Sequence, residues 1–592
     1  MVKYNEIASR NELADFLGIE RRYLTYVLYH LKVENCYRKF EIPKKNGSKR
    51  TINAPDERLK PIQKRLASAL AVHQKHVRKE KNIKANISHA FEKKKSIFSN
   101  AKIHRNRRFV INIDLKDFFD SFNFGRVRGF FMKNEDFMVP EDVATVIAQI
   151  ACYEGKLPQG SPSSPVITNL ICQILDYRLL KVASEHKVDY TRYADDMTFS
   201  TNSRDFPDHL DRFLQDVTDV VSRAGFLINE DKTRLQLRDS RQSVTGLVVN
   251  KKLNTRFEYR RNTRTMAYCL YKTGEFEIDE IKGSMEQLEG RFSFIDQVDS
   301  KGLRYWERLI EARKLQSSKS FQHSDHVFTG REKGYQRFLF YKNFYNHDKP
   351  VVLTEGKTDT VHLRAALKNL YKDYPSLISR KKDGSFEYKI AFHKRTSKKF
   401  EYYFGLTAGA DASTSFYSYF TNRDNNKKVP NYWKYFNDMC PNVSKHPVIL
   451  LFDNELVQGK PVQKFINVVS GSDEKKKTIM AALKKGLPSS ILEDGNLYLM
   501  TVPKSVTKKE GDIEDLYESK VLKTKIKGRL FSRKAIPKST KHYGKHELSL
   551  YVNCNYETIN FDEFRPLFDA LIEVIKDYKN TARRLKRRNS RI

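Results

Sequence analysis

Two adjacent carboxylates stand in a segment whose pattern otherwise predicts a β-hairpin. The segment TRYADDMTFS (191–200) places Asp195 and Asp196 between Tyr193 and a Met-Thr-Phe run. Adjacent like charges repel, and aspartate is a poor strand former. A solvated turn would accommodate the pair, and so would a bound cation. A third carboxylate, Asp114, ends the apolar strand RRFVINIDL (107–115) about eighty residues earlier.

Three carboxylates that meet at one place repel each other strongly at low effective dielectric. Two Mg²⁺ ions reverse this cost, because each takes a few carboxylate oxygens and leaves its other positions to water and substrate phosphates. Such a pair of ions activates a hydroxyl and neutralises a departing pyrophosphate. The pattern therefore favours metal-dependent nucleotidyl transfer at Asp114, Asp195 and Asp196.

The C-terminal half repeats this arrangement of acids on other predicted strands. VVLTEGKTD and VILLFDNE read as buried strands that end in acids, and EGDIEDLYE adds a late acidic group. Open α/β sheets bind ligands beyond the carboxyl ends of their strands, where these acids would converge. A single acid at a strand end is more often a helix cap, but three groups weaken that alternative. The acids are Glu355, Asp359, Asp453, Glu455, Asp512 and Glu514.

The elements that must position these acids differ between the two halves. In the first half, helical segments surround the strand 107–115, the hairpin 191–200 and a basic hairpin over 38–54. In the second half, strands alternate with helices, which predicts a parallel α/β sheet. We expect a first domain over 1–320, a linker over 321–348 and a second domain over 349–592.

The composition favours a nucleic-acid partner. The 592 residues include 109 Lys and Arg against 72 Asp and Glu, a formal net charge of +37. A field of this sign attracts polyanions. Six scattered cysteines without a CxxC pair predict reduced thiols and no zinc site. No long apolar run or signal peptide is apparent, so we expect a bacterial cytoplasmic protein without a membrane partner.

Five segments of the first half resemble the motifs A to E of reverse transcriptases, in order: FVINIDLKDFF, LPQGSPSSPVITNL, YADD, GFLINEDKT and VTGLVVN. The resemblance implies an α+β right-hand polymerase, with fingers and palm over about 1–250 and a thumb over about 251–320. It implies that Asp114, Asp195 and Asp196 hold two Mg²⁺ with the backbone carbonyl of Leu115.

The same resemblance assigns residues that bind the incoming dNTP. Phe119 would exclude a 2′-hydroxyl by its bulk. Gln159 and Gly160 of LPQG would line the nucleotide pocket, where glycine permits a close backbone approach. The fingers residues Lys44, Lys45 and Arg50 would contact the triphosphate, although a solvated charged turn is an equal alternative for the two lysines.

Two further segments resemble signatures of bacterial retron enzymes. NAKIH contains Asn100 and His104, and VTG covers Val244, Thr245 and Gly246. This resemblance implies a structured noncoding RNA, priming from a 2′-hydroxyl, and a product of branched multicopy single-stranded DNA (msDNA). The RNA would also contact RFEYRRNTR, and a homo-oligomeric ribonucleoprotein is possible. The arginines of RFEYRRNTR that would contact the RNA are Arg256, Arg260 and Arg261.

The second group of acids resembles a Toprim domain of the kind found in overcoming-lysogenization-defect nucleases. There a glutamate and a DxD element bind one or two Mg²⁺, and the element here is DNE, with Glu455 in place of the second aspartate. A retron enzyme fused to Toprim implies a toxic antiphage nuclease that is restrained by the msDNA. Two alternatives remain: the second half binds nucleic acid without catalysis, or the chain is a mobile-element reverse transcriptase unrelated to defence.

Overall fold

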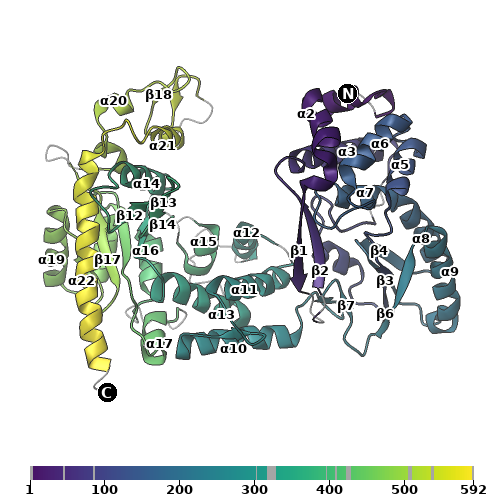
Figure 1. Ribbon diagram of the computed structural model, residues 1–592. Helices are drawn as coiled ribbons and strands as arrows, with labels where there is room; N and C mark the ends of the chain where they lie inside the picture. The colour runs from purple at the N-terminus through teal and green to yellow at the C-terminus, as the bar shows by residue number, and fades with distance from the viewer. Residues whose placement is uncertain are drawn as a thin grey trace. The chain divides into compact units, whose positions relative to one another are not determined.

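The computed structural model separates into two compact units, Met1–Arg256 and Phe257–Ile592, each described here by itself. Figure 1 shows the elements of both units along the chain. The described residues are 4–43, 47, 49–83, 87–301, 303–315, 328–394, 397–406, 410–421, 429–504, 510–534 and 539–589.

The first unit is built around an antiparallel sheet with the strand order β4-β5-β3-β6. The sheet strands are β3 (Phe109–Lys116), β4 (Asp189–Tyr193), β5 (Asp196–Thr201) and β6 (Leu227–Leu237). Two hairpins accompany it, β1 (Tyr37–Pro43) with β2 (Lys49–Pro55), and β7 (Ser243–Val244) with β8 (Leu247–Val248). Its α-helices are α1 (Arg10–Phe16), α2 (Arg21–Thr25), α3 (Lys60–Glu80), α4 (Ile97–Ile103), α5 (Phe124–Lys133), α6 (Glu141–Ala151), α7 (Ser164–Ile171), α8 (Gln173–Glu185) and α9 (Leu210–Arg223).

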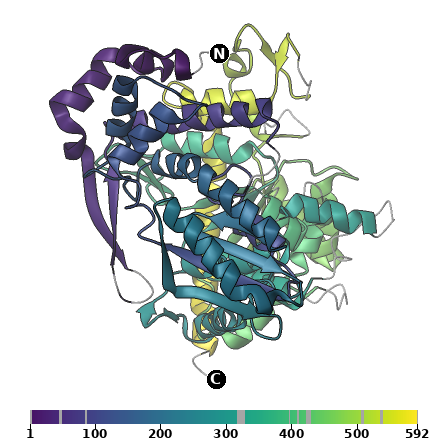
Figure 2. The same cartoon turned by 90° about the vertical axis from the view of Figure 1, so that its right-hand side faces the viewer.

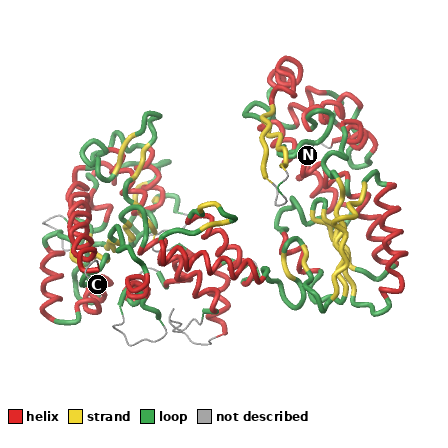
Figure 3. The backbone as a smooth tube through the Cα atoms, turned by 60° about the horizontal axis from the view of Figure 1, so that its bottom comes forward, coloured by secondary structure: helices red, strands yellow, loops and turns green. Residues whose placement is uncertain are grey.

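One hydrophobic core holds the sheet of the first unit under its helices. Ile111 and Ile113 of β3 and Met197 and Phe199 of β5 are buried, because alternate side chains of a strand share one face. Helices α8 and α9 lie against this sheet (Figure 2), and Phe213 of α9 packs edge-on to Phe199. The long hairpin β1–β2, visible in Figure 3, confirms the hairpin expected over 38–54.

The second unit contains a five-stranded sheet with the order β14-β11-β15-β17-β16, in which only β16 is antiparallel to its neighbour. Its strands are β14 (Ala391–Lys394), β11 (Val351–Thr354), β15 (Val448–Phe452), β17 (Leu497–Thr501) and β16 (Ser489–Ser490). The longer helices are α10 (Phe257–Thr273), α11 (Met285–Asp299), α12 (Tyr305–Leu315), α13 (Gly330–Phe340), α14 (Asp359–Asn369), α15 (Lys398–Phe404), α16 (Ala410–Tyr417), α17 (Tyr432–Met439), α18 (Pro461–Ser470), α19 (Asp473–Lys484), α21 (Lys545–Cys554) and α22 (Arg565–Asn589).

Two separate cores cover the two faces of this sheet. Leu450 of β15 belongs to the core with α13 and α15–α19, while its neighbours Ile449 and Leu451 belong to the core with α14, α21 and α22. A strand buried on both faces reads as a continuous apolar run, as VILLF does. The alternation of strands and helices therefore predicted the parallel sheet correctly.

The limits between the parts of the chain differ from those expected. We expected a thumb over about 251–320 with the polymerase half, but α10 and α11 share a core with the second unit through Leu270, Tyr271 and Phe292. We expected a linker over 321–348. Its described part, from Phe328 on, contains α13 and a π-helical turn (Tyr341–Tyr345) with buried aromatic side chains. Because α13 and this turn pack into the core of the second unit, the described part of the expected linker belongs to that unit.

Within the described ranges, no helix is both long enough and apolar enough to cross a membrane.

Candidate active site

The three acids of the first unit meet at one edge of the palm sheet. Asp114 of β3 and Asp196 of β5 are paired residues on neighbouring strands. Asp195 lies in the turn between β4 and β5, and its carbonyl accepts a hydrogen bond of 3.0 Å from the backbone N–H of Leu115. The register of the sheet therefore brings the carboxylates together, as the sequence predicted.

The electrostatics of this edge suit a bound cation. Burial raises the pKa of Asp196 to about 7, and Asp195 and Asp114 add to the rise. Burial and the nearby Asp114 also raise the pKa of Asp195. The ammonium of Lys232 on β6 lies 2.7 Å from Asp114 Oδ2, so a cation already neutralises part of the charge. Carboxylate oxygens are the ligands that Mg²⁺ prefers, and the donor set fits this ion.

A buried ion pair that the sequence reasoning missed supports the acidic turn. Arg192 of β4 is fully buried and binds Asp176 of α8 through two contacts of 2.7 and 2.8 Å. Arg192 Nη1 also donates to the carbonyl of Ala194, whose φ is 58°. This strained residue directly precedes Asp195. An arginine within the predicted strand, three residues before Asp195, was the available signal.

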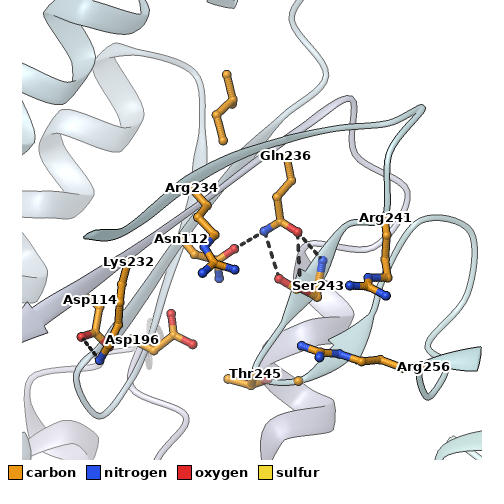
Figure 4. Close-up of a pocket in the computed structure, with 12 residues that line it drawn as sticks. Asn112, Asp114, Asp196, Lys232, Arg234, Gln236, Arg241, Ser243, Thr245 and Arg256 are labelled. Atoms are coloured by element: carbon orange, nitrogen blue, oxygen red, sulfur yellow. Dashed lines mark hydrogen bonds and ion pairs between the residues drawn. The ribbon is translucent and has the colours of Figure 1, made fainter. Parts of the chain in front are cut away.

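A pocket of about 620 Å³ extends from these acids (Figure 4). Arg234, Arg241 and Arg256 contribute basic side chains to it, beside the turn at Thr245 and Gly246. Gln236 joins β3 to β7, because its amide donates to Asn112 Oδ1 and its Oε1 accepts from the Ser243 N–H at 2.7 Å. The remaining lining residues are Asp114, Asp196, Lys232 and Leu235.

Of the residues predicted to bind the dNTP, Arg50 lies near the acids. Arg50 of β2 is exposed, and its positive charge lies close enough to Asp195 to oppose part of the rise in the pKa of that carboxyl. Phe119 is half-buried, whereas Phe118 is buried against Phe226. Lys44 and Lys45 lie outside the described residues.

Gly160 approaches the fingers hairpin closely. Its φ is 122°, and a Cβ placed there would lie 2.7 Å from the carbonyl oxygen of Asn53 and 2.9 Å from Ile52 Cγ2. The adjacent Gln159 carbonyl accepts a hydrogen bond of 2.8 Å from the Asn53 N–H. The glycine is therefore required for contact with β2, a reason that differs from the predicted approach to a nucleotide.

The burial of Asn100 and His104 does not support the prediction that they contact RNA, which stays a prediction. Both side chains are fully buried. His104 lies 2.8 Å from Ser200 Oγ and 2.7 Å from Thr191 Oγ1, and Thr191 also donates to Asn100 Oδ1. Burial lowers the pKa of His104 to about 3, so the ring is neutral at pH 7. The buried side chains of the NAKIH segment therefore connect α4 to β4 and β5 through hydrogen bonds.

The VTG segment forms the turn of the β7–β8 hairpin. Val244 is buried, while Thr245 and Gly246 have φ values of 46° and 82°, as a tight hairpin turn requires. Thr245 Oγ1 donates to the Ile97 carbonyl at the start of α4. The NAKIH helix and the VTG turn therefore contact each other. Only Thr245 and Gly246 of the VTG triplet line the pocket.

The three arginines of RFEYRRNTR fall in different units. Arg256 lines the pocket of the first unit. Arg260 and Arg261 lie on α10 in the second unit, where Arg261 lines a separate cavity with Tyr268. Whether they bind RNA stays a prediction.

Comparisons with known proteins agree with this site. Residues 42–266 match the family described as reverse transcriptase (RNA-dependent DNA polymerase). The chain is 32% identical over 348 residues to the retron Mx162 reverse transcriptase of Myxococcus xanthus, covering 53% of this chain and 69% of that protein. It is 34% identical over 271 residues to the retron Ec86 reverse transcriptase of Escherichia coli, covering 45% and 78%. The chain belongs to the retron reverse transcriptases.

Retron reverse transcriptases are RNA-directed DNA polymerases that synthesise msDNA, and they have a right-hand polymerase fold. Among solved structures, apo telomerase from Candida tropicalis matches at 13% identity and a TM-score of 0.30, over 51% of this chain and 60% of the telomerase. That likeness is too weak to bear on the fold.

The second unit of this retron reverse transcriptase gathers acids at the carboxyl ends of its strands. Glu355 follows β11 and Asp453 follows β15, and these two strands are parallel neighbours. Burial raises the pKa of Asp453 to about 8, and Asp359, Glu355 and Asp512 add to the rise. Asp359 also accepts a hydrogen bond of 2.6 Å from the Gly356 N–H. These four acids therefore lie together, as expected.

Basic side chains hold the late acidic segment. Lys545 of α21 lies 2.8 Å from Glu514 and 3.3 Å from Asp512, and Arg533 pairs with Asp512 and Asp515. Glu514 is fully buried, and its pKa is raised to about 7 by burial. Sequence reasoning missed both basic residues, because they follow the acids by many positions without a motif.

Glu455 is paired with a lysine. Its carboxylate lies 3.0 Å from Lys460 Nζ. Its role as a metal ligand stays a prediction that this pairing does not support. Across the described parts of both units, no three acidic, histidine or cysteine side chains converge closely enough to hold a metal ion without rearrangement.

Proposed function

We propose that this retron reverse transcriptase copies a structured noncoding RNA into branched msDNA and begins from a 2′-hydroxyl of that RNA. The observation that carries the proposal is the pairing of Asp114 with Asp196, with Asp195 in the adjoining turn, in a chain of this family. The surplus of positive charge fits an RNA partner.

Asp114, Asp195 and Asp196 would hold the two Mg²⁺ ions that activate a hydroxyl and stabilise the leaving pyrophosphate. The Asp195 turn is fixed by Arg192, and the Leu115 N–H ties it to β3. Arg50 would contact the triphosphate, and the half-buried Phe119 would lie against the sugar. Lys232 would compete with a metal ion for Asp114, because both bind the same carboxylate.

The test is expression of the gene with its flanking intergenic sequence, followed by extraction of small nucleic acids. A short DNA whose mobility changes after treatment with a 2′–5′ debranching enzyme supports the proposal, and Asp195→Asn should abolish it. If this DNA is absent while the protein extends a primer on RNA in vitro, the protein is a polymerase but does not prime from a 2′-hydroxyl.

A second activity is favoured by the acids around Asp453. We propose that the second unit is a Toprim-type, Mg²⁺-dependent nuclease that acts as the toxic effector of an antiphage system restrained by the msDNA. The support is that Glu355 and Asp453 follow neighbouring parallel strands, and that Glu355, Asp359 and Asp512 lie near enough to Asp453 to raise its pKa. A divalent cation would lower the repulsion among these acids.

Glu355→Gln tests the nuclease, with Glu387→Gln on the exposed part of β13 (Phe386–Tyr388) as the matched control. Loss of toxicity in triggered cells for Glu355→Gln alone supports a nuclease. Full toxicity of Glu355→Gln would make the second unit a binding module. A chain without a neighbouring noncoding RNA gene would instead be a mobile-element enzyme.

A further inference from the structure

The pocket beside the polymerase acids has two ends of opposite charge. Asp114 and Asp196 stand at one end, and Arg241 and Arg256 stand at the other, beside Thr245 (Figure 4). Among the twelve described residues that line the pocket, these two aspartates are the only acids. A polyanion that places a hydroxyl at the acidic end would therefore place phosphates near the basic end.

The basic end is fixed relative to the catalytic strand. Gln236 links Asn112 of β3 to the backbone of Ser243, so β7 is held in register with the strand that carries Asp114. Arg241 directly precedes Gln242, which is fully buried and donates to the carbonyls of Arg108 and Gln236. The guanidinium of Arg241 is thus exposed on an anchored backbone.

A 2′-primed reaction needs such an arrangement for a chemical reason. A primer that reacts through its 3′-hydroxyl ends at the reacting ribose, and only its 5′ phosphate is nearby. A primer that reacts through its 2′-hydroxyl keeps its 3′ phosphodiester, so the RNA strand continues past the reacting ribose. That second phosphate lies next to the metal-binding carboxylates, which repel it unless cations are close.

We propose that Arg234, Arg241 and Arg256 bind the phosphates of the RNA strand that leaves the priming nucleotide through its 3′ oxygen. The inference rests on the proposed 2′-priming and adds the residues that select for it. In the reaction, the 2′ oxygen forms a bond to the α-phosphorus of the first dNTP, the α–β bond breaks, pyrophosphate leaves and the hydroxyl proton passes to water. The 3′ phosphodiester is retained throughout.

The test compares two reactions of one protein. In the first, the enzyme begins synthesis on its cognate RNA, and the branched product is measured. In the second, it extends a DNA primer with a 3′-hydroxyl annealed to the same RNA. For the double variant Arg241→Gln/Arg256→Gln we expect branch formation to fall about tenfold or more and 3′ extension to change less than about threefold. The matched control Arg212→Gln/Arg223→Gln, at two exposed arginines of α9 outside the pocket, removes the same charge and should change neither.

Equal losses in both reactions, or no loss in either, would overturn the inference. A second measurement separates it from the proposed function. We expect wild-type protein to bind a synthetic branched oligoribonucleotide, with both 2′–5′ and 3′–5′ linkages on one nucleotide, several-fold more tightly than a linear one of equal charge. The double variant should lose this preference. If wild type has no preference, the inference fails even where branched msDNA is found. If the preference exists but no msDNA is made, only the proposed function fails.

Discussion

Lys232 and Asp114 form an ion pair across β6 and β3, with Nζ and Oδ2 2.7 Å apart. The ammonium therefore occupies an oxygen that a metal ion would need. Lys232→Ala should increase the affinity for Mn²⁺ about two- to tenfold, because binding no longer displaces a cation. Water-proton relaxation measures this affinity, with Lys251→Ala, an exposed lysine outside the pocket, as control. Weaker binding in Lys232→Ala would show that the lysine supports the metal rather than competes with it.

Gly160→Ala should displace the fingers hairpin from the palm. Its Cβ would meet the Asn53 carbonyl oxygen at 2.7 Å, and the positive φ adds strain of about 1–3 kcal/mol. We expect the KM for dNTP to rise about tenfold in primer extension. Gly155→Ala is the matched control, because its φ is also positive while its Cβ would meet nothing within 4 Å. Equal effects of both substitutions would assign the change to backbone strain alone.

The buried His104 should make the first unit sensitive to acid. Burial, with Arg107 and His89 nearby, lowers the pKa of His104 to about 3, below its ordinary 6.5. Between these values the unfolded chain binds a proton that the folded chain does not, so stability present above pH 6.5 is lost as the pH falls.

His104→Gln removes this proton-linked loss. The decrease in melting temperature between pH 7.5 and pH 5 should be smaller in His104→Gln than in wild type. His209→Gln, at an exposed position, should leave the decrease unchanged. An identical pH dependence of wild type and His104→Gln would refute the linkage.

Gln236→Ala should loosen the β7–β8 hairpin without disturbing the dNTP site. The substitution leaves the half-buried Ser243 N–H and Asn112 Oδ1 without this partner, at a cost near the lower end of the range of about 1–3 kcal/mol for buried groups. We expect a raised KM for primer–template and an unchanged KM for dNTP in steady-state extension. Gln215→Ala on the exposed face of α9 serves as control. A selective change in the KM for dNTP would contradict this role.

Lys545→Met should expose the repulsion among the acids of the second unit. The fully buried Glu514 then loses its partner at 2.8 Å, and breaking a buried pair costs about 3–5 kcal/mol. Burial raises the pKa of Glu514 to about 7, so protonation relieves the cost at low pH. Calorimetry should therefore show a larger loss of melting temperature at pH 8 than at pH 6, and partial recovery with millimolar Mg²⁺ at pH 8. Equal losses at both pH values would contradict this interpretation.

The sequence predicted the elements whose signals are local. The strand ending at Asp114 and the turn at Asp195 follow from alternation and turn chemistry within about ten residues. The sheet around Asp453 follows from short apolar runs between helices. Each of these features depends on neighbours along the chain.

The features that sequence reasoning missed depend on distant partners. His104 forms a buried hydrogen bond with Ser200, 96 positions later, and Gly160 is required because the Asn53 carbonyl lies opposite. The limit after Arg256 was missed because the helices that follow bury their aromatic faces against a sheet that begins only at Val351. No local sequence pattern indicates which hydrophobic core a helix packs into.

The shared core of α10, α11 and α13 with the α/β sheet has a consequence for dissecting the protein. A truncation at residue 320 or 349 would leave Leu270, Tyr271 and Phe292 on one fragment and Leu450 on the other, each with its apolar surface open to water. Both fragments would aggregate, and their inactivity would say nothing about either chemistry. A cut between Arg256 and Phe257 would instead fall at the boundary between the two units. Because α10 shares its core with the α/β sheet, an oligonucleotide that protects α10 from proteolysis should also protect that sheet.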